Sequence, residues 1–313
     1  MRTYIDQLHV GAGSQIGPVT TFPVWTAASS LPALQLPPRA SVEVAEMPEP
    51  RIDALHVTVS GGEPVLLTEG TLLRGGMQSR VLTRDALLLP QQRGQVETAC
   101  VESGRWGGVA EHAVAGRVPL RVIGELRGVR RPVQMRDDRA DRQSRVWHSV
   151  DRYQSHYGRR PTSSLIEVME GPDEEQPMRR RYRRLFDELE RAARRPLPGQ
   201  NGIMIGLAGQ PVMLEVFTSA DALGQVLPGM LRGLAMDAAM FDNEPTPARR
   251  ARRFAERLMA TPLESSREVA DGVIYSASRG YLDVRALDAR LGEREGSAHI
   301  LAINSRHDLV LAA

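Results

Sequence analysis

The chain has 313 residues, 42% of them hydrophobic and 25% charged, which is typical of a globular protein with one large or two ordinary domains. All 40 basic residues are arginine, because the sequence contains no lysine, and 38 acidic residues leave a formal net charge of +2. The lack of lysine excludes P-loop NTPases, kinases and Schiff-base enzymes, and the small net charge predicts no general attraction to nucleic acid.

The first 130 residues are predicted to form strands. Short runs of alternating apolar and polar residues, broken by proline and glycine, occur at 3–10, 18–25, 41–47 and 54–60 and recur between 64 and 106. Strands this close together, with no helices between them, indicate an antiparallel β-sandwich or an open barrel. The sequence GAGSQIG at 11–17 resembles a dinucleotide-binding fingerprint, but Pro18 and an extended segment follow it, so we expect a turn between strands.

The middle of the chain has the period of helices. Apolar residues at helical spacing, namely Val146, Trp147, Val150 and Tyr153, predict a helix over 140–160, and 161–168 begins another with Thr162 or Ser163 as its cap. The clearest helix covers 178–195 and stops at Pro196. It carries eight arginines, but Arg183–Asp187 and Arg184–Glu188 are spaced four apart, which favours a solvated face over a nucleic-acid surface.

The last third returns to strands mixed with helices. We expect a hairpin over 202–217 with its turn at 208–211, a helix capped by Ser219 and reaching about 240, and a further helix over 248–257. Strand-like runs follow at 272–278, 299–304 and 308–313. The predicted fold is therefore α+β, with a β-rich domain at 1–135 and a helical segment plus a smaller mixed α/β unit at 136–313, either separate or integrated into one domain.

The only cysteine lies in CVESGRW, residues 100–106. In a strand, Cys100 and Glu102 point to one side, and Gln78 and Arg80 share a face in an earlier strand. Two interpretations stay open: a nucleotide-like ligand held by arginine and tryptophan, or a structural ion-pair cluster. The candidate ligand-binding residues are Gln78, Arg80, Cys100, Arg105 and Trp106, and the candidate general bases are Glu69 and Glu102.

Several other sites are not expected. The seven histidines show no metal-binding spacing, no G-x-S-x-G nucleophile motif occurs, and no histidine near Cys100 in sequence would activate its thiol. No apolar run approaches the length of a membrane helix and the first residues do not read as a secretory signal, so we expect a cytoplasmic protein without a membrane partner. No cofactor or oligomeric state follows from the sequence.

Several segments resemble a bacterial family named for its association with ADP-ribosylglycohydrolase and rhodanese-phosphatase proteins. The most specific are LLTEGTLLRGGMQSRVLTRDALLLP at 66–90 and CVESGRW at 100–106, followed by ADRQSRVWHSV at 140–150, GIMIGLAGQPVMLEVFTSADAL at 202–223 and GMLRGLAMDA at 229–238. The resemblance implies a role near NAD and ADP-ribose metabolism, as a binding or processing module for an NAD-derived or ADP-ribosylated ligand. The alternative is a non-enzymatic interaction or assembly protein with a protein partner.

The chain departs from the family pattern at three positions. Met77 and Ser79 stand where the family has lysine and asparagine, and Arg142 stands where it has glutamine after Asp141. If the family site uses that lysine or asparagine on a ligand, these departures alter or abolish its activity.

Overall fold

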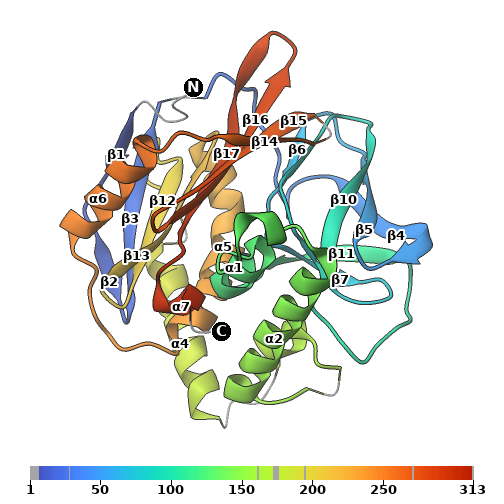
Figure 1. Ribbon diagram of the computed structural model, residues 1–313, viewed down its shortest axis with the longest axis horizontal. Coiled ribbons are helices and arrows are strands. Elements are labelled where there is room, and N and C mark those ends of the chain that lie inside the picture. Colours follow the sequence, from blue (N-terminus) through green and yellow to red (C-terminus); the bar gives the residue numbers. More distant parts are fainter. Residues whose placement is uncertain are drawn as a thin grey trace.

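The computed structural model describes residues 7–27, 29–160, 162–171, 176–193, 195–269 and 271–311. In these residues a closed β-barrel and a nine-stranded antiparallel sheet stand side by side, with helices at their junction (Figure 1). The predicted α+β class is confirmed. A single apolar core runs through the junction, because one cluster of buried side chains includes Val81 of the barrel, Leu231 of a junction helix and Leu301 of the sheet.

The barrel accounts for most of the strands predicted between residues 41 and 106, whereas those predicted at 3–10 and 18–25 belong to the large sheet. Its six strands, in hydrogen-bonding order, are β10 (Arg93–Cys100), β5 (Ala54–Val59), β4 (Val42–Arg51), β11 (Glu111–Arg117), β7 (Thr71–Gly75) and β8 (Arg80–Leu82). The strands β6 (Val65–Leu67) and β9 (Ala86–Leu88) pair with each other. Alternate residues such as Val44, Leu73, Leu82 and Val96 form one apolar cluster, as the period of two requires. The predicted antiparallel β-structure is thus confirmed, but the barrel is closed and not open, it covers only residues 42–117, and Leu120–Arg127 forms a helix.

The large sheet joins the first strands of the chain to the last. Its order is β1 (Leu8–Val10), β3 (Val19–Thr26), β12 (Gly202–Leu207), β13 (Gln210–Phe217), β17 (Arg294–Asn304), β16 (Leu282–Leu291), β15 (Gly272–Arg279) and β14 (Ser265–Val269), with β2 (Ser14–Ile16) paired to β3. The GAGSQIG segment runs into β2 and turns at Gly17, so the predicted turn between strands is confirmed. The boundary at 135/136 stays a prediction.

The helices are α1 (Leu120–Arg127), α2 (Arg139–Tyr157), α3 (Leu165–Glu170), α4 (Pro177–Ala193), α5 (Ala220–Ala238), α6 (Ala248–Met259) and α7 (Asp308–Leu311), with a 3-10 turn at Val133–Met135. Helix α6 covers the outer face of the large sheet, whereas α1 and α5 lie towards the barrel (Figure 1). None of the helices within the described segments is both long and apolar enough to cross a membrane.

Three expectations about these elements need correction. The strand predicted at 308–313 is wrong, because Asp308–Leu311 is a helix; a run of four apolar or capping residues is too short for its period to separate helix from strand. The cap of α3 is Ser164, whose side chain accepts a hydrogen bond from the Glu167 amide, and not Thr162 or Ser163. Trp147 is exposed, although its neighbours in the predicted stripe are buried.

Parts of four predicted elements lie outside the described residues. These are residues 3–6 of the first strand, Pro161, Arg194 and residues 312–313.

Candidate functional site

Three of the predicted ligand-binding residues meet at one mouth of the barrel. Cys100 at the end of β10 is paired with Arg80 at the start of β8, and Arg80 Nη1 lies 3.0 Å from Cys100 Sγ. The thiol donates to Gln78 Oε1 at 2.6 Å, and Arg80 Nη1 donates to the Gln78 carbonyl at 3.0 Å. All three side chains are buried, with Arg80 0% exposed. The alternation of strand residues therefore placed these groups together correctly.

Two further members of this cluster come from neighbouring strands. Glu46 on β4 and His112 on β11 are both buried, and Glu46 Oε1 lies 3.2 Å from His112 Nε2. Glu46 Oε1 also accepts the Met77 amide at 2.8 Å and lies 3.8 Å from Arg80 Nη2. We call Glu46, Gln78, Arg80, Cys100 and His112 the mouth cluster. Glu46 could have been found from the sequence, because it follows the inward residue Val44 by two positions.

The environment of Cys100 does not activate its thiol. Burial raises the pKa of Cys100 to about 11, even though the adjacent Arg80 opposes that shift. The thiol is therefore neutral at pH 7, whereas a nucleophilic cysteine needs a thiolate. The backbone of Cys100 is also held on both sides by Gln143 of α2, whose amide accepts from the Cys100 N–H at 2.8 Å and donates to its carbonyl at 2.9 Å.

We expect Cys100 to be unreactive in the folded protein. A disulfide reagent such as DTNB should release no thiol signal from native protein over minutes at pH 7.5, because the protonated sulfur is buried and occupied by hydrogen bonds. The same titration in guanidinium chloride should release the full signal of the single cysteine. Rapid reaction of native protein would show that the mouth cluster is open.

Glu102 and Arg105 form a tight pair beside the mouth cluster. Arg105 donates to the two carboxylate oxygens of Glu102 at 2.9 and 2.7 Å, and the Ser79 amide donates to the same carboxylate at 2.9 Å. Burial raises the pKa of Glu102, but the hydrogen bonds from Arg105 and Ser79 outweigh it and lower the pKa below its ordinary value. The pair lines a cavity of about 540 Å³ facing α3. Trp106 is 57% exposed, and its ring centroid lies 5.9 Å from Arg80 Cζ.

Glu69 belongs to a different buried network. Its carboxylate accepts from Arg127 at 2.9 and 2.7 Å and from Arg285 at 2.7 Å. Arg127 also contacts Asp283 of β16 at 3.2 Å. The seven residues singled out from the sequence therefore lie in three places and do not surround one open pocket. Gln78, Arg80 and Cys100 lie in the mouth cluster, with Trp106 next to Arg80. Glu102 pairs with Arg105, and Glu69 belongs to the separate network of Arg127 and Arg285.

The departures from the family pattern have structural roles here. Met77 and Ser79 act through their backbone amides, which donate to Glu46 and Glu102. The third, Arg142, forms an ion pair with Glu97.

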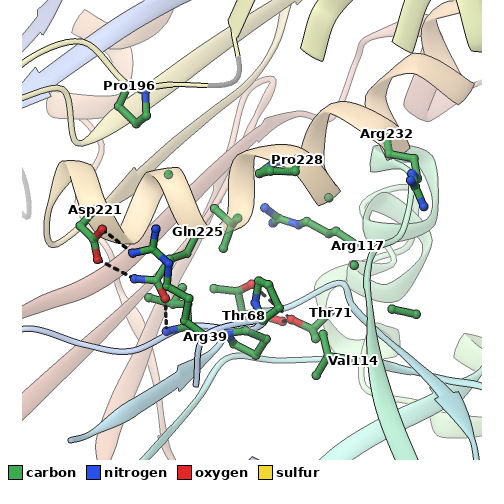
Figure 2. Close-up of a pocket in the computed structure, with 18 of the residues that line it drawn as sticks. Arg39, Thr68, Thr71, Val114, Arg117, Pro196, Asp221, Gln225, Pro228 and Arg232 are labelled. Carbon is green, nitrogen blue, oxygen red and sulfur yellow. Dashed lines mark hydrogen bonds and ion pairs between the residues drawn. The ribbon is translucent and has the colours of Figure 1, made fainter. Parts of the chain in front are cut away.

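A further cavity lies where the barrel meets α5, and the sequence did not indicate it. It has a volume of about 700 Å³, and we call it the interface pocket. Figure 2 shows Arg39, Asp221 and Gln225 linked on one side of it, with Arg117 extending towards Pro228 of α5. Its charged lining residues are Arg39, Arg117, Arg195, Arg232, Glu190 and Asp221. Four arginines against two carboxylates favour an anionic ligand.

The backbone of β11 and α5 shapes this pocket. A bulge between Val114 and Gly116, with Gly116 at φ 109°, interrupts the pairing of β11 with β7 and re-aims the residue that follows. Helix α5 crosses at Gly229, where a Cβ atom would lie 3.2 Å from both the Gly116 Cα and the Arg117 nitrogen. Glycine at both positions therefore permits the close approach that brings Arg117 under the helix.

Arg117 is the deepest cation of the interface pocket. Its Nη1 donates to Glu215 at 2.7 Å, whereas Nε and Nη2 are buried and have no hydrogen-bond partner among the described residues. Behind it, Glu215 Oε1 lies 2.8 Å from His299 Nε2, and His299 Nδ1 lies 2.7 Å from Asp85 Oδ2. We call Arg117, Glu215, His299 and Asp85 the pocket relay. It begins at the pocket and ends near Glu69, whose amide donates to Asp85 at 2.7 Å.

The charges of the pocket relay balance in its buried setting. Burial lowers the pKa of His299, but Asp85 and Glu215 outweigh it and raise the pKa to about 9. Burial raises the pKa of Glu215, but Arg117 and His299 outweigh it and lower the pKa below its ordinary value. At pH 7 the relay therefore consists of two cations and two anions in alternation. The ion pair with Glu215 holds the Arg117 guanidinium in place, while its Nε and Nη2 keep no hydrogen-bond partner among the described residues.

Sequence reasoning could have found only part of this relay. Glu215 lies in the segment that resembles the family's Asp/Glu-x-Phe-x-Ser step. Nothing in the sequence pattern marked Arg117 or His299 as site residues, because a bulge and two long-range strand pairings bring them to the pocket. Within the described segments, no group of three or more histidine, cysteine, aspartate or glutamate side chains is placed to hold a metal ion.

Comparison with known proteins identifies one family. No curated protein and no solved structure matches the chain. The model of the ARG and Rhodanese-Phosphatase-superfamily-associated Protein domain, ARPP-1, matches residues 7–298, which include the barrel, the interface pocket and nearly all of the large sheet. The chain therefore belongs to the ARPP-1 family.

Proposed function

We propose that the chain is a binding or processing module for an NAD-derived or ADP-ribosylated ligand, and that the interface pocket holds this ligand. The observation that carries the proposal is Arg117, a buried residue that lines a cavity of about 700 Å³ and whose Nε and Nη2 lack partners among the described residues. The family's name links it to proteins associated with ADP-ribosylglycohydrolases, which supports this class of ligand.

A diphosphate group offers the hydrogen-bond acceptors that Arg117 Nε and Nη2 lack among the described residues. An unpaired buried N–H costs about 1–3 kcal/mol, and two phosphate oxygens would pair both nitrogens of the guanidinium fork. Arg39, Arg195 and Arg232 add positive charge around the pocket, while Phe186, Pro196 and Pro228 supply apolar wall for a ring. The volume lies within the roughly 300–1,000 Å³ range of small-molecule sites.

The geometry of Gln78, Arg80 and Cys100 favours the second interpretation of the sequence, a structural cluster, over a ligand site. In the mouth cluster, Cys100 Sγ donates to Gln78 Oε1, Arg80 Nη1 contacts both of these atoms, and all three side chains are buried, although Arg80 Nε and Nη2 have no hydrogen-bond partner among the described residues. We propose that this cluster closes the barrel. Glu69 and Glu102 do not line the interface pocket, so binding there does not depend on either candidate base. A ligand contact by Arg105 at the smaller cavity, or by the exposed Trp106, stays a prediction, as does a protein partner.

Calorimetric titration tests the proposed ligand class. We expect ADP-ribose and NAD to bind with micromolar to submillimolar Kd, and nicotinamide, which has no phosphate, to give no heat. Absence of heat from all three at millimolar concentration would overturn the ligand class.

The variant Arg117→Lys tests the location. Lysine keeps a positive charge beside Glu215 but loses the planar fork, so ADP-ribose binding should weaken by about tenfold or more, with only a small change in Tm. Arg74→Lys is the matched control, because Arg74 lies on the neighbouring strand β7 and pairs with Glu170 at the surface. Equal ADP-ribose affinity of Arg117→Lys and wild type would show that the ligand does not bind in the interface pocket.

A further inference from the structure

A second polar cavity lies on the large sheet, away from the interface pocket. It has a volume of about 580 Å³ and is formed by β14, β15 and β16 together with Arg84, Arg136 and Asp137. It shares no lining residue with the interface pocket. We call it the sheet pocket.

The strand register aligns polar side chains across the floor of the sheet pocket. Ser265 of β14 is paired with Ser276 of β15, which is paired with Arg285 of β16, and Ser278 is paired with Asp283. Residues directly opposite one another in antiparallel strands project from the same face. The three strands therefore present a row of hydroxyl, hydroxyl and guanidinium groups to the cavity, with a second hydroxyl–carboxylate row beside it.

The sheet pocket contains both satisfied and free polar groups. Arg285 is held by Glu69 at 2.7 Å, and Arg136 donates to Ser278 at 3.1 Å, so these two cations are fixed. By contrast, Arg279 and the hydroxyls of Ser265 and Ser276 form no hydrogen bond or ion pair with any described residue, although all three line the cavity. Fixed cations beside free donors are the arrangement that an incoming anion with hydroxyl groups can use.

The lining also discriminates between classes of anion. Its five arginines are Arg84, Arg136, Arg267, Arg279 and Arg285, and its three carboxylates are Asp137, Glu264 and Asp283. Guanidinium groups suit phosphate, and the serine hydroxyls and carboxylates suit sugar hydroxyls. No aromatic side chain is among the described residues that line it, so a nucleobase would find no ring on which to stack.

We infer that the sheet pocket is a second binding site, for the phosphate monoester of a small polyhydroxylated molecule such as a sugar phosphate. Arg279 and Arg285 would contact the phosphate, and Ser265 and Ser276 the hydroxyl groups. This inference is independent of the ligand proposed for the interface pocket, because the two cavities use different residues.

Titration with ribose 5-phosphate as the probe tests the inference. We expect ribose 5-phosphate to bind, inorganic phosphate to bind more weakly, and ribose to give no signal. Arg279→Gln and Ser276→Ala should each weaken ribose 5-phosphate binding, by about tenfold for the arginine and less for the serine. Both groups are unpaired in the described structure, so neither change should lower Tm. Arg290→Gln is the matched control, because Arg290 lies on the same strand β16 but pairs with Glu295 outside the pocket.

The outcomes separate the two sites. Weaker binding in Arg279→Gln, with Arg290→Gln and Arg117→Lys unchanged, supports the sheet pocket. Loss in Arg117→Lys alone would place the sugar phosphate in the interface pocket and overturn the inference, as would no binding of ribose 5-phosphate at millimolar concentration. ADP-ribose binding should be unaffected by Arg279→Gln, so failure of one proposal leaves the other standing.

Discussion

Replacing Arg127 by methionine should lower the free energy of unfolding by about 3–5 kcal/mol, the largest single-residue effect that we expect. Arg127 is fully buried at the end of α1 and contacts two carboxylates, Glu69 of the barrel side at 2.7 Å and Asp283 of the sheet at 3.2 Å. It also donates to the Leu301 carbonyl at 3.1 Å. Methionine keeps an unbranched apolar stem but leaves buried negative charge without this partner, which is the costly way to break an ion pair.

Urea denaturation followed by circular dichroism measures this loss. Arg131→Met is the matched control: Arg131 lies four residues further on, is half exposed, and pairs with the partly exposed Asp141. An exposed pair of this kind contributes about 0–1 kcal/mol, so the control should be nearly as stable as wild type. Equal, small losses in both variants would mean that the barrel and the sheet do not depend on Arg127 for their junction.

Local patterns predicted most of the elements. The period of two identified the barrel strands and placed Arg80, Cys100 and Gln78 together, because inward positions of paired strands must meet inside a closed sheet. The period of helices identified α2, α4 and α5, including the Ser219 cap of α5. The four-residue helix α7 was mistaken for a strand, since it is little more than one helical turn and shows no repeated helical spacing.

Long-range pairing could not be predicted in the same way. Strand β3 pairs with β12 across the chain, and a periodic pattern indicates that a strand exists but not which partner it takes. Glu69 shows the consequence, because its partners Arg127 and Arg285 lie 58 and 216 residues away. The interface pocket was missed for the same reason, since its key cation depends on a β-bulge and on a helix that crosses it.

The pocket relay should make the protein less stable as the pH rises from about 6.5 to about 9. Burial lowers the pKa of His299, but the attraction of Asp85 and Glu215 outweighs it and raises the pKa from 6.5 to about 9 in the folded state. A raised pKa means that the folded protein holds a proton that the unfolded chain releases. The stabilisation is therefore complete below pH 6.5 and is lost as the pH approaches 9. A shift of this size corresponds to about 3 kcal/mol.

Chemical denaturation at a series of pH values tests this expectation. The shifted pKa values of Cys100, His112 and His307 affect stability outside the range of pH 6.5 to 9. Burial raises the pKa of Cys100 to about 11, so its contribution is lost only above the window. His112 and His307 have lowered pKa values, mainly through burial, and act on the acid side.

The variant His299→Gln assigns the slope to this residue. Glutamine cannot carry the charge, so the variant should be less stable than wild type at pH 6.5 and should lose the decline between pH 6.5 and 9. His148→Gln, at an exposed position on α2, should keep the full wild-type slope. A flat wild-type profile would mean that His299 is neutral in the folded protein. Asp85 and Glu215 would then face it as two buried carboxylates with no cation between them, and Arg117 would be the only charge holding Glu215 at the pocket.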